Sequence, residues 1–263
     1  MNTASLEWID LVDLIVSAGK TTFSRGFTCI ERLNSTTTIS MEYPVMGIKE
    51  RKLNYRFMIA EALFILSGDN TVAGITPWCK KMAEYSDDGE VFFGAYGPRI
   101  ASQKEYVVSA LNADPGTRQA VMTIWRENPP KTKDVPCTVS LQFLVRFDKL
   151  HCIANMRSSD AWLGWPYDVF NFSMLSACIA LSLKQKVKLG KLYLNAGSQH
   201  LYERDIRAAR TILACEEEIL DCAPIDISTL DKPVDLLNHL ECLRDQKFDA
   251  TPYTFMKEIF NVR

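Results

Sequence analysis

The chain has 263 residues, of which 47% are hydrophobic, 24% charged and 10% aromatic. This balance is that of an ordinary globular protein, and it excludes intrinsic disorder, collagen-like repeats and low-complexity sequence. The 30 Lys and Arg residues against 32 Asp and Glu give a formal charge of −2. Because no basic excess runs through the chain, we do not expect nucleic acid as a partner.

The cysteines indicate the redox setting. All eight are scattered, and no two form a C-x-x-C pair, which favours reduced thiols in an intracellular protein. Residues 1–20 carry acidic side chains within their apolar stretch and no basic segment before it, so we expect no signal peptide and a cytoplasmic location. The longest uncharged run, Val169 to Leu183, has 15 residues, which is too short to cross a bilayer.

Apolar spacing and turn residues predict the elements of the first half of the chain. The expected order is a helix over 4–19, a loop around Arg25, a strand through 36–41, a helix over 54–67 and a short helix over 103–112. Glu61 flanks the apolar face of the 54–67 helix, where a carboxylate is unusual. It is therefore a candidate for chemistry.

Strands dominate the middle of the chain. Residues 120–125, 138–147 and 150–155 alternate or are β-branched, and Asp148-Lys149 links the last two as a hairpin. The elements expected after them are a long helix over 168–186, a strand over 191–195 and an amphipathic helix over 202–220. Since no repeat or linker interrupts residues 1–263, we expect a single α+β domain around a large sheet.

One cysteine stands in an unusual place. Cys137 follows Pro136 at the start of a predicted strand, where a thiol is held rigid and partly exposed. It is either a catalytic nucleophile or a buried structural thiol, since a free cysteine often serves as a small hydrophobic residue.

Three further places in the sequence carry charged or aromatic residues that could bind a ligand. The segment 156–168 gathers two carboxylates, a guanidinium and two tryptophans around a Gly and a Pro, as either a binding segment or a solvated loop. His200 stands at the start of the predicted 202–220 helix, as either a ligand-binding residue or a cap. Arg25 and Arg118 lie in loops beside Gly, Ser or Thr, where a guanidinium either binds a phosphate or is merely solvated.

Taken in order, these pieces resemble the thymidylate synthase family. The resemblance runs from about Arg25 to Glu203 and is densest between Asp114 and Tyr202. Its motifs are Glu61-Ala62-Leu63-Phe64-Ile65-Leu66-Ser67-Gly68-Asp69, Gly94-Ala95-Tyr96-Gly97, Asp114-Pro115-Gly116-Thr117-Arg118, Pro136-Cys137, Arg157-Ser158-Ser159-Asp160 with Leu163-Gly164, and His200-Leu201-Tyr202. Each motif alone is weak, whereas six in the right order are a specific signature.

The resemblance implies a thymidylate synthase-like fold with a large mixed sheet and flanking helices, and a homodimer whose active sites are completed by the partner chain. It implies 5,10-methylenetetrahydrofolate as the one-carbon co-substrate, without a metal. Cys137 is similar to the nucleophile that adds to C6 of the pyrimidine, Glu61 to a proton-relay carboxylate and Tyr96 to a member of the proton network. Burial of Glu61 on its apolar helix face would raise the pKa of this carboxyl.

The resemblance also implies the binding residues. The nucleotide phosphate and sugar would be held by Arg25, Arg118 reaching across the dimer, Gln119 in place of a second arginine, Arg157, Ser158, His200 and Tyr202. The reduced folate would be held by Trp78, Asp160, Leu163 and Gly164.

Asp168 departs from the thymidylate synthase pattern, which has Asn at this position. That Asn donates to O4 and accepts from N3–H of uracil, whereas cytosine offers an N4 amino donor and an N3 acceptor. A carboxylate accepts from N4 and shares a proton with N3, so we expect a cytidine nucleotide as substrate, with dCMP preferred.

Two residues near Cys137 also differ from the thymidylate synthase pattern, and they too favour a cytidine nucleotide as substrate. Thr138 and Met156 stand where thymidylate synthases usually have His and Gln, and these runs resemble the phage deoxycytidylate hydroxymethylases of the same family. We therefore expect hydroxymethylation of dCMP, in the cytoplasm of a phage-infected bacterium.

Four alternatives stay open. Methylation of dCMP with release of dihydrofolate is favoured by Trp78, because a tryptophan packed against the methylene group favours hydride transfer. The others are thymidylate synthesis from dUMP, hydroxymethylation of CMP, and a catalytically idle relative that binds nucleotide or RNA.

Overall fold

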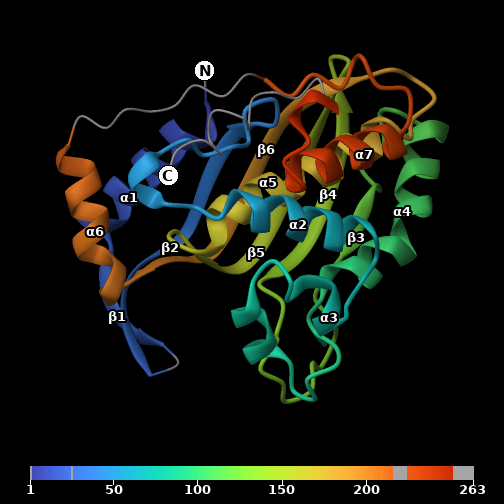
Figure 1. Cartoon of the computed structure of the whole chain (residues 1–263). Coiled ribbons are helices and arrows are strands. Elements are labelled where there is room, and N and C mark those ends of the chain that lie inside the picture. Colours follow the sequence, from blue (N-terminus) through green and yellow to red (C-terminus); the bar gives the residue numbers. More distant parts are fainter. Residues whose placement is uncertain (1, 25, 216–223, 251–263) are drawn as a thin grey trace.

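A six-stranded mixed sheet forms the centre of the computed structural model, which describes residues 2–24, 26–215 and 224–250 (Figure 1). The strand order is β1-β2-β6-β5-β4-β3. Their bounds are β1 Lys20–Ser24, β2 Phe27–Ser40, β3 Val121–Thr123, β4 Thr138–Arg146, β5 Lys149–Asp160 and β6 Lys188–Tyr202. Neighbouring strands are antiparallel except β5 and β6, which run parallel. A parallel pair requires a crossover, and here helix α5 supplies it.

The helices surround this sheet. They are α1 Ala4–Ala18, α2 Tyr55–Leu66, α3 Val72–Ile75, α4 Tyr96–Ala113, α5 Gly164–Ala180, α6 Glu203–Ala214 and α7 Pro233–Arg244, with short 3-10 helices η1 Lys49–Arg51, η2 Lys80–Tyr85 and η3 Phe248–Ala250. The α+β architecture expected from the sequence is thereby confirmed. Within the described ranges, every helix is too short or too polar to cross a membrane.

Helix α5 is the central element of the core. Almost all of its side chains are buried, as expected for a helix that is apolar on every side, and it packs against β5, β6 and α2. Ser173 and Ser176 donate their hydroxyl groups to carbonyls of the helix itself at 2.7 Å, so their burial leaves no unpaired hydroxyl. Helix α5 therefore presents a rigid first turn to the functional site.

One face of the sheet carries a row of polar side chains. Thr36 donates to Asn195 at 2.9 Å, Asn195 to Asn155 at 3.1 Å and Asn155 to Ser140 at 3.2 Å, so that hydrogen bonds join side chains of four adjacent strands. Their strand neighbours Leu192, Leu194 and Ala154 are buried on the opposite face, with the core.

Several predicted elements are confirmed, and the β4–β5 turn shows why. The predicted helices at 4–19 and 54–67 are α1 and α2, and the 138–155 hairpin is β4–β5. Its turn places Phe147 and Asp148 at positive φ values of 52° and 56°, which matches the right-handed twist of the strands. The side chain of Asn54 caps α2 by accepting from the backbone N–H of Phe57 at 3.0 Å.

Other boundaries differ from the prediction. Residues 20–40 form the β1–β2 hairpin instead of a loop and a short strand, α4 begins at Tyr96, and α5 spans 164–180 instead of 168–186. Strands β5 and β6 pair as far as Asp160 and His200. His200 therefore lies in a strand, because tertiary pairing overrides turn-like local composition. Tyr202 ends β6 and is the N-cap of α6, so the predicted start of the 202–220 helix is confirmed to within one residue. The end of the predicted 202–220 helix lies outside the described residues.

Candidate active site

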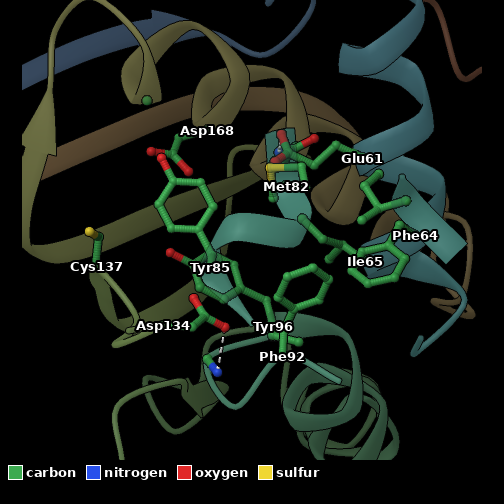
Figure 2. A pocket seen from close by; sticks show the side chains of 15 residues that line it. Glu61, Phe64, Ile65, Met82, Tyr85, Phe92, Tyr96, Asp134, Cys137 and Asp168 are labelled. Carbon is green, nitrogen blue, oxygen red and sulfur yellow. Dashed lines mark hydrogen bonds between the residues drawn. The ribbon is translucent and has the colours of Figure 1, made fainter. Parts of the chain in front are cut away.

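A cavity of about 330 Å³ lies between α2, η2, the start of α4, the segment before β4 and the first turns of α5 (Figure 2). It is lined by Glu61, Phe64, Ile65, Ile75, Met82, Tyr85, Phe92, Gly94, Ala95, Tyr96, Asp134, Cys137, Gly164, Asp168 and Asn171. All four residues predicted to be catalytic therefore border one space, although they come from four separate parts of the chain. Its apolar wall suits the flat faces of aromatic rings.

Cys137 lies directly before β4 and is held by a neighbouring guanidinium. Arg157 on β5 donates from Nε to the carbonyl of Pro136 at 2.9 Å and from Nη2 to that of Val135 at 3.0 Å. The same Nη2 lies 3.8 Å from the Cys137 sulfur. A positive charge at this distance attracts negative charge to the sulfur, which is what a nucleophilic thiol requires.

Tyr96 packs beside the residue that follows the nucleophile. Its hydroxyl oxygen accepts from the backbone N–H of Thr138 at 3.3 Å and lies 3.0 Å from the Thr138 hydroxyl. Burial, together with the negative charges of Asp168 and Cys137, raises the pKa of Tyr96 well above its usual range. The phenol therefore keeps its proton and can act as a hydrogen-bond donor in the cavity.

Of the three carboxyl residues that line the cavity, Glu61 lies on α2 and Asp168 on α5. Burial raises the pKa of Glu61 to about 7, against the lowering effect of a hydrogen bond from Asn171. Burial also raises the pKa of Asp168 well above its ordinary value, and the charges of Glu61 and Asp160 add to this. Such groups can give and take protons near neutral pH.

Gly94 and Asp134 join the segment before the nucleophile to the start of α4. The backbone N–H of Gly94 donates to the Asp134 carboxylate at 2.7 Å, which leaves no room for a side chain at position 94. A Cβ there would lie 2.4 Å from the Asp134 carbonyl oxygen.

We expect Gly94→Ala to lower the free energy of unfolding by roughly 1–3 kcal/mol, because the added methyl group forces two backbone segments apart. Urea unfolding checks the size of this loss, with Gly89→Ala as the matched control. A Cβ at Gly89 meets no neighbouring atom, but its φ of 80° strains an alanine. Because Gly94 has no positive φ, its loss cannot come from such strain, and a free energy of unfolding unchanged in Gly94→Ala would contradict the steric contact with Asp134.

The segment between β5 and α5 is anchored at both ends. The Asp160 carboxylate accepts from the backbone N–H of Trp162 at 2.8 Å and from that of Leu163 at 3.2 Å. The buried guanidinium of Arg51 lies 3.6 Å from the Trp162 ring centre. A Cβ at Gly164 would come within 3.5 Å of Asp168, so this segment adjoins the carboxyl group in the cavity.

The predicted sugar ligands lie at the ends of paired strands. Asp160 and Ser158 on β5 stand opposite His200 and Ser198 on β6. His200 is buried, its ring centre lies 5.0 Å from that of Tyr202, and its Nδ1 has no hydrogen-bond partner among the described residues. This set therefore adjoins the start of α5, but it does not line the cavity itself.

Four predicted residues lie elsewhere or are not described. Arg118 and Gln119 are exposed in the loop before β3, at the edge of the sheet, and do not line the cavity. Arg25 lies outside the described residues. Trp78 borders a neighbouring space of about 210 Å³, where its ring centre lies 5.2 Å from the Arg56 guanidinium and 4.9 Å from that of Arg244.

The cavity residues that were not predicted from the sequence include Met82, Tyr85 and Asn171. Met82 and Tyr85 reach the cavity from η2, in a stretch with no clear sequence pattern, while the more conspicuous Trp78 lies outside it. Asn171 lies one helical turn after Asp168, and that spacing along a predicted helix could have identified it.

A metal has no evident place here. Among the described residues, no group of three or more His, Cys, Asp or Glu side chains is arranged to hold a metal ion.

Comparisons with known proteins agree with this geometry. The chain is similar to the deoxyuridylate hydroxymethyltransferase of Bacillus phage SP01, with 29% identity over 254 residues. The alignment covers 86% of this chain but 63% of the phage protein, so the chain spans less than two thirds of that relative's length. The family model for thymidylate synthase matches residues 6–259. Because that match includes the whole cavity and nearly the whole chain, the protein belongs to the thymidylate synthase family.

Proposed function

We propose that the protein is a one-carbon transferase, a single catalytic domain that hydroxymethylates C5 of dCMP with 5,10-methylenetetrahydrofolate as co-substrate. The observation that carries this proposal is the convergence of Cys137, Glu61 and Asp168 on one cavity. A nucleophile, a carboxyl group of pKa about 7 and a second carboxyl group whose pKa burial raises well above its ordinary value are the parts that this reaction requires.

The first step is addition of the Cys137 thiolate to C6 of the pyrimidine. As the carbon–sulfur bond forms, electrons move from the C5–C6 double bond toward N3, and Asp168 donates its proton there. C5 thereby becomes an enamine carbon that attacks the one-carbon unit of the folate. Water in the cavity then takes the proton from C5, and the electron pair of the broken C–H bond expels tetrahydrofolate, whose nitrogen receives a proton. This leaves an exocyclic methylene group on C5.

Water completes the reaction. Its oxygen forms a bond to the methylene carbon while Glu61 accepts its proton, and the electron pair moves into the ring. The pair then re-forms the C5–C6 double bond as the Cys137 thiolate leaves C6. The products are the 5-hydroxymethyl nucleotide and tetrahydrofolate, and no reductant is consumed.

The choice of water over hydride is supported by the cavity wall. The argument for a methyl product depends on a tryptophan beside the methylene group, but Trp78 borders the neighbouring space. Met82 and Tyr85 line the cavity instead, and the half-exposed Tyr85 leaves its mouth open to water. The phage relative is likewise named as a hydroxymethyltransferase.

The base preference depends on the proton of Asp168. With cytosine, this proton lies between the carboxyl group and basic N3, while the other oxygen accepts from the N4 amino group. Both hydrogen bonds gain ionic character, which makes them stronger than the neutral pair that a protonated carboxyl group forms with uracil.

A second candidate is hydroxymethylation of dUMP. The phage relative is named for deoxyuridylate, and a protonated Asp168 can also donate to O4 and accept from N3–H of uracil. The two candidates differ in which nucleotide is turned over faster.

The affinity for dCMP should fall as the pH rises. The Asp168–N3 pair needs one shared proton, and burial keeps that proton on the enzyme well above the ordinary pKa of an aspartate. We expect a constant dissociation constant below the raised pKa of Asp168 and an increase of about tenfold per pH unit above it. Calorimetric titration from acidic to alkaline pH measures this, and a flat profile would contradict the shared proton.

The nucleotide phosphate and sugar contacts complete the proposal. We assign the phosphate to Arg25, Arg157 and Ser158, with Arg118 and Gln119 supplied by a partner subunit, since both lie at a sheet edge away from their own cavity. We assign the 3′-hydroxyl to His200 and Tyr202, and the folate to Asp160, Leu163 and Gly164 together with Tyr85. The polar sheet face of Thr36, Asn195, Asn155 and Ser140 is the surface we assign to the homodimer.

Parallel incubations test this function. The protein is mixed with methylenetetrahydrofolate and dCMP, dUMP or CMP, and each nucleotide product is identified by mass spectrometry. We expect 5-hydroxymethyl-dCMP as the fastest product, formed without dihydrofolate. Faster turnover of dUMP would establish the second candidate, and no turnover of any nucleotide would contradict both. The setting we propose is the cytoplasm of a bacterium infected by a phage that builds modified cytosine into its DNA.

A further inference from the structure

Asn171 makes a direct contact with Glu61 inside the cavity. It lies on α5, three residues after Asp168, and is 4% exposed. Its side-chain Nδ2 donates to Glu61 Oε2 at 2.8 Å, across the contact between α5 and α2. Because Asn171 and Glu61 both line the space that holds Cys137, this bond lies at the site of the chemistry.

The other end of the Asn171 amide is unpaired. Its Oδ1 is buried and has no hydrogen-bond partner among the described residues. A buried carbonyl without a donor destabilises a fold, and an apolar side chain of similar shape, such as leucine, avoids that penalty. Packing therefore does not explain an amide here, whereas its bond to Glu61 does.

The groups around Glu61 determine how readily this carboxyl group ionises. The titratable groups around it are all neutral or negative. They are Tyr167 and Asp168 on α5, Tyr96 on α4, Tyr85 on η2, and Asp134 and Cys137 in the segment before β4. On α7, which packs on another side of α2, Arg244 lies over Trp78. Burial favours the protonated form of Glu61. Among the described residues around it, the Asn171 amide is the group that favours the ionised form.

We propose that Asn171 is a positioning residue, which holds the Glu61 carboxylate ionised and turned so that its second oxygen can take a proton from water in the cavity. This inference rests on the proposed function, in which Glu61 accepts the proton of the attacking water. In this role Asn171 needs to touch neither the substrate nor the reacting atoms. Its effect on the reaction passes through Glu61.

The variant Asn171→Leu tests this role, because leucine has a similar size and no donor. Without the donor, Glu61 holds its proton to higher pH, so less of the required carboxylate is present at neutral pH. We expect the rising limb of kcat to move up by about one pH unit and kcat at pH 7 to fall about fivefold, since the ionised fraction of Glu61 falls from about one half to about one tenth. At high pH kcat should return toward the wild-type value, with KM for dCMP within about twofold throughout.

Stability separates this role from a structural one. Asn171→Leu removes an unpaired buried carbonyl, so the melting temperature should stay the same or rise. Asn171→Asp keeps the shape but faces Glu61 with a second carboxyl group, so its rising limb should move further up than that of the leucine variant. The matched control is Ser176→Ala, also on α5, whose hydroxyl bonds within the helix. Its pH profile should not move.

Two results would overturn the proposal. One is a fall in kcat by the same factor at every pH in Asn171→Leu. The other is a lower melting temperature with an unmoved rising limb.

A measurement without substrate tests the role of Asn171 independently of the proposed function. Infrared titration of the Glu61 carboxyl band, identified by its loss in Glu61→Gln, gives its ionisation midpoint in the free protein. We expect a higher midpoint in Asn171→Leu than in the wild type. An equal midpoint would overturn the role of Asn171 even in an active enzyme. A shifted midpoint in a protein that converts no nucleotide would support the Asn171–Glu61 coupling and contradict the proposed function.

Discussion

Cys137→Ser should reduce kcat by roughly a thousandfold or more, because a hydroxyl group is protonated at neutral pH and a thiol is far easier to ionise. The guanidinium of Arg157, whose Nη2 lies 3.8 Å from the sulfur, increases that difference. Nucleotide binding should persist, since the bonds from Arg157 to the backbone carbonyls of Val135 and Pro136 do not involve the sulfur. Steady-state kinetics and calorimetric titration with dCMP measure the two effects separately.

The control for this variant is Cys79→Ser. Cys79 is also half-buried and free, but it lies near Trp78 and does not line the cavity. We expect it to keep wild-type turnover within about threefold, as a substitution outside the chemistry should. A Cys137→Ser enzyme that retained a substantial share of wild-type turnover would contradict the covalent mechanism.

Asp168→Asn should move the substrate preference from dCMP toward dUMP. An amide donates to O4 and accepts from N3–H of uracil, but toward cytosine it must leave one polar group unpaired or reverse its orientation. Sites built around hydrogen bonds discriminate strongly on this basis, so we expect the ratio of kcat/KM for dCMP over dUMP to fall by about a hundredfold or more. Competition between the two nucleotides in one tube measures the ratio directly.

The matched control is Asp134→Asn. Asp134 also lines the cavity, but it binds the backbone N–H of Gly94, away from the predicted base position. Its substitution should change turnover of both nucleotides alike. If the ratio stayed at its wild-type value in Asp168→Asn, Asp168 would not be the residue that selects the base.

The candidate catalytic residues could be predicted to this extent because chemistry restricts residue type and local position. Glu61 was identified as a carboxylate on an apolar helix face, and Cys137 as a thiol fixed after a proline. The structure brings both to the cavity that Asp168 and Tyr96 also line. Their convergence itself followed from the order of the motifs, which resembled a family, and not from any single pattern.

What could not be predicted depends on long-range structure. His200 and Tyr202 were predicted as sugar ligands, but their place in a strand follows from the pairing of β6 with β5 along nearly its whole length, which no local signal contains. The family resemblance assigned Trp78 to the folate, and its ring lies near two guanidiniums that approach from α2 and α7. Asn171 became visible only when its contact with Glu61 was seen.

Isotope-labelled water shows directly whether water or hydride is the final donor to the methylene group. The reaction is run with dCMP and methylenetetrahydrofolate in water enriched in heavy oxygen. The mass of the nucleotide product is determined by mass spectrometry, and dihydrofolate is followed by its absorbance. The account predicts a hydroxymethyl product that carries the heavy isotope, formed without dihydrofolate. A methyl product without the isotope, formed together with dihydrofolate, would contradict it and identify hydride as the final donor.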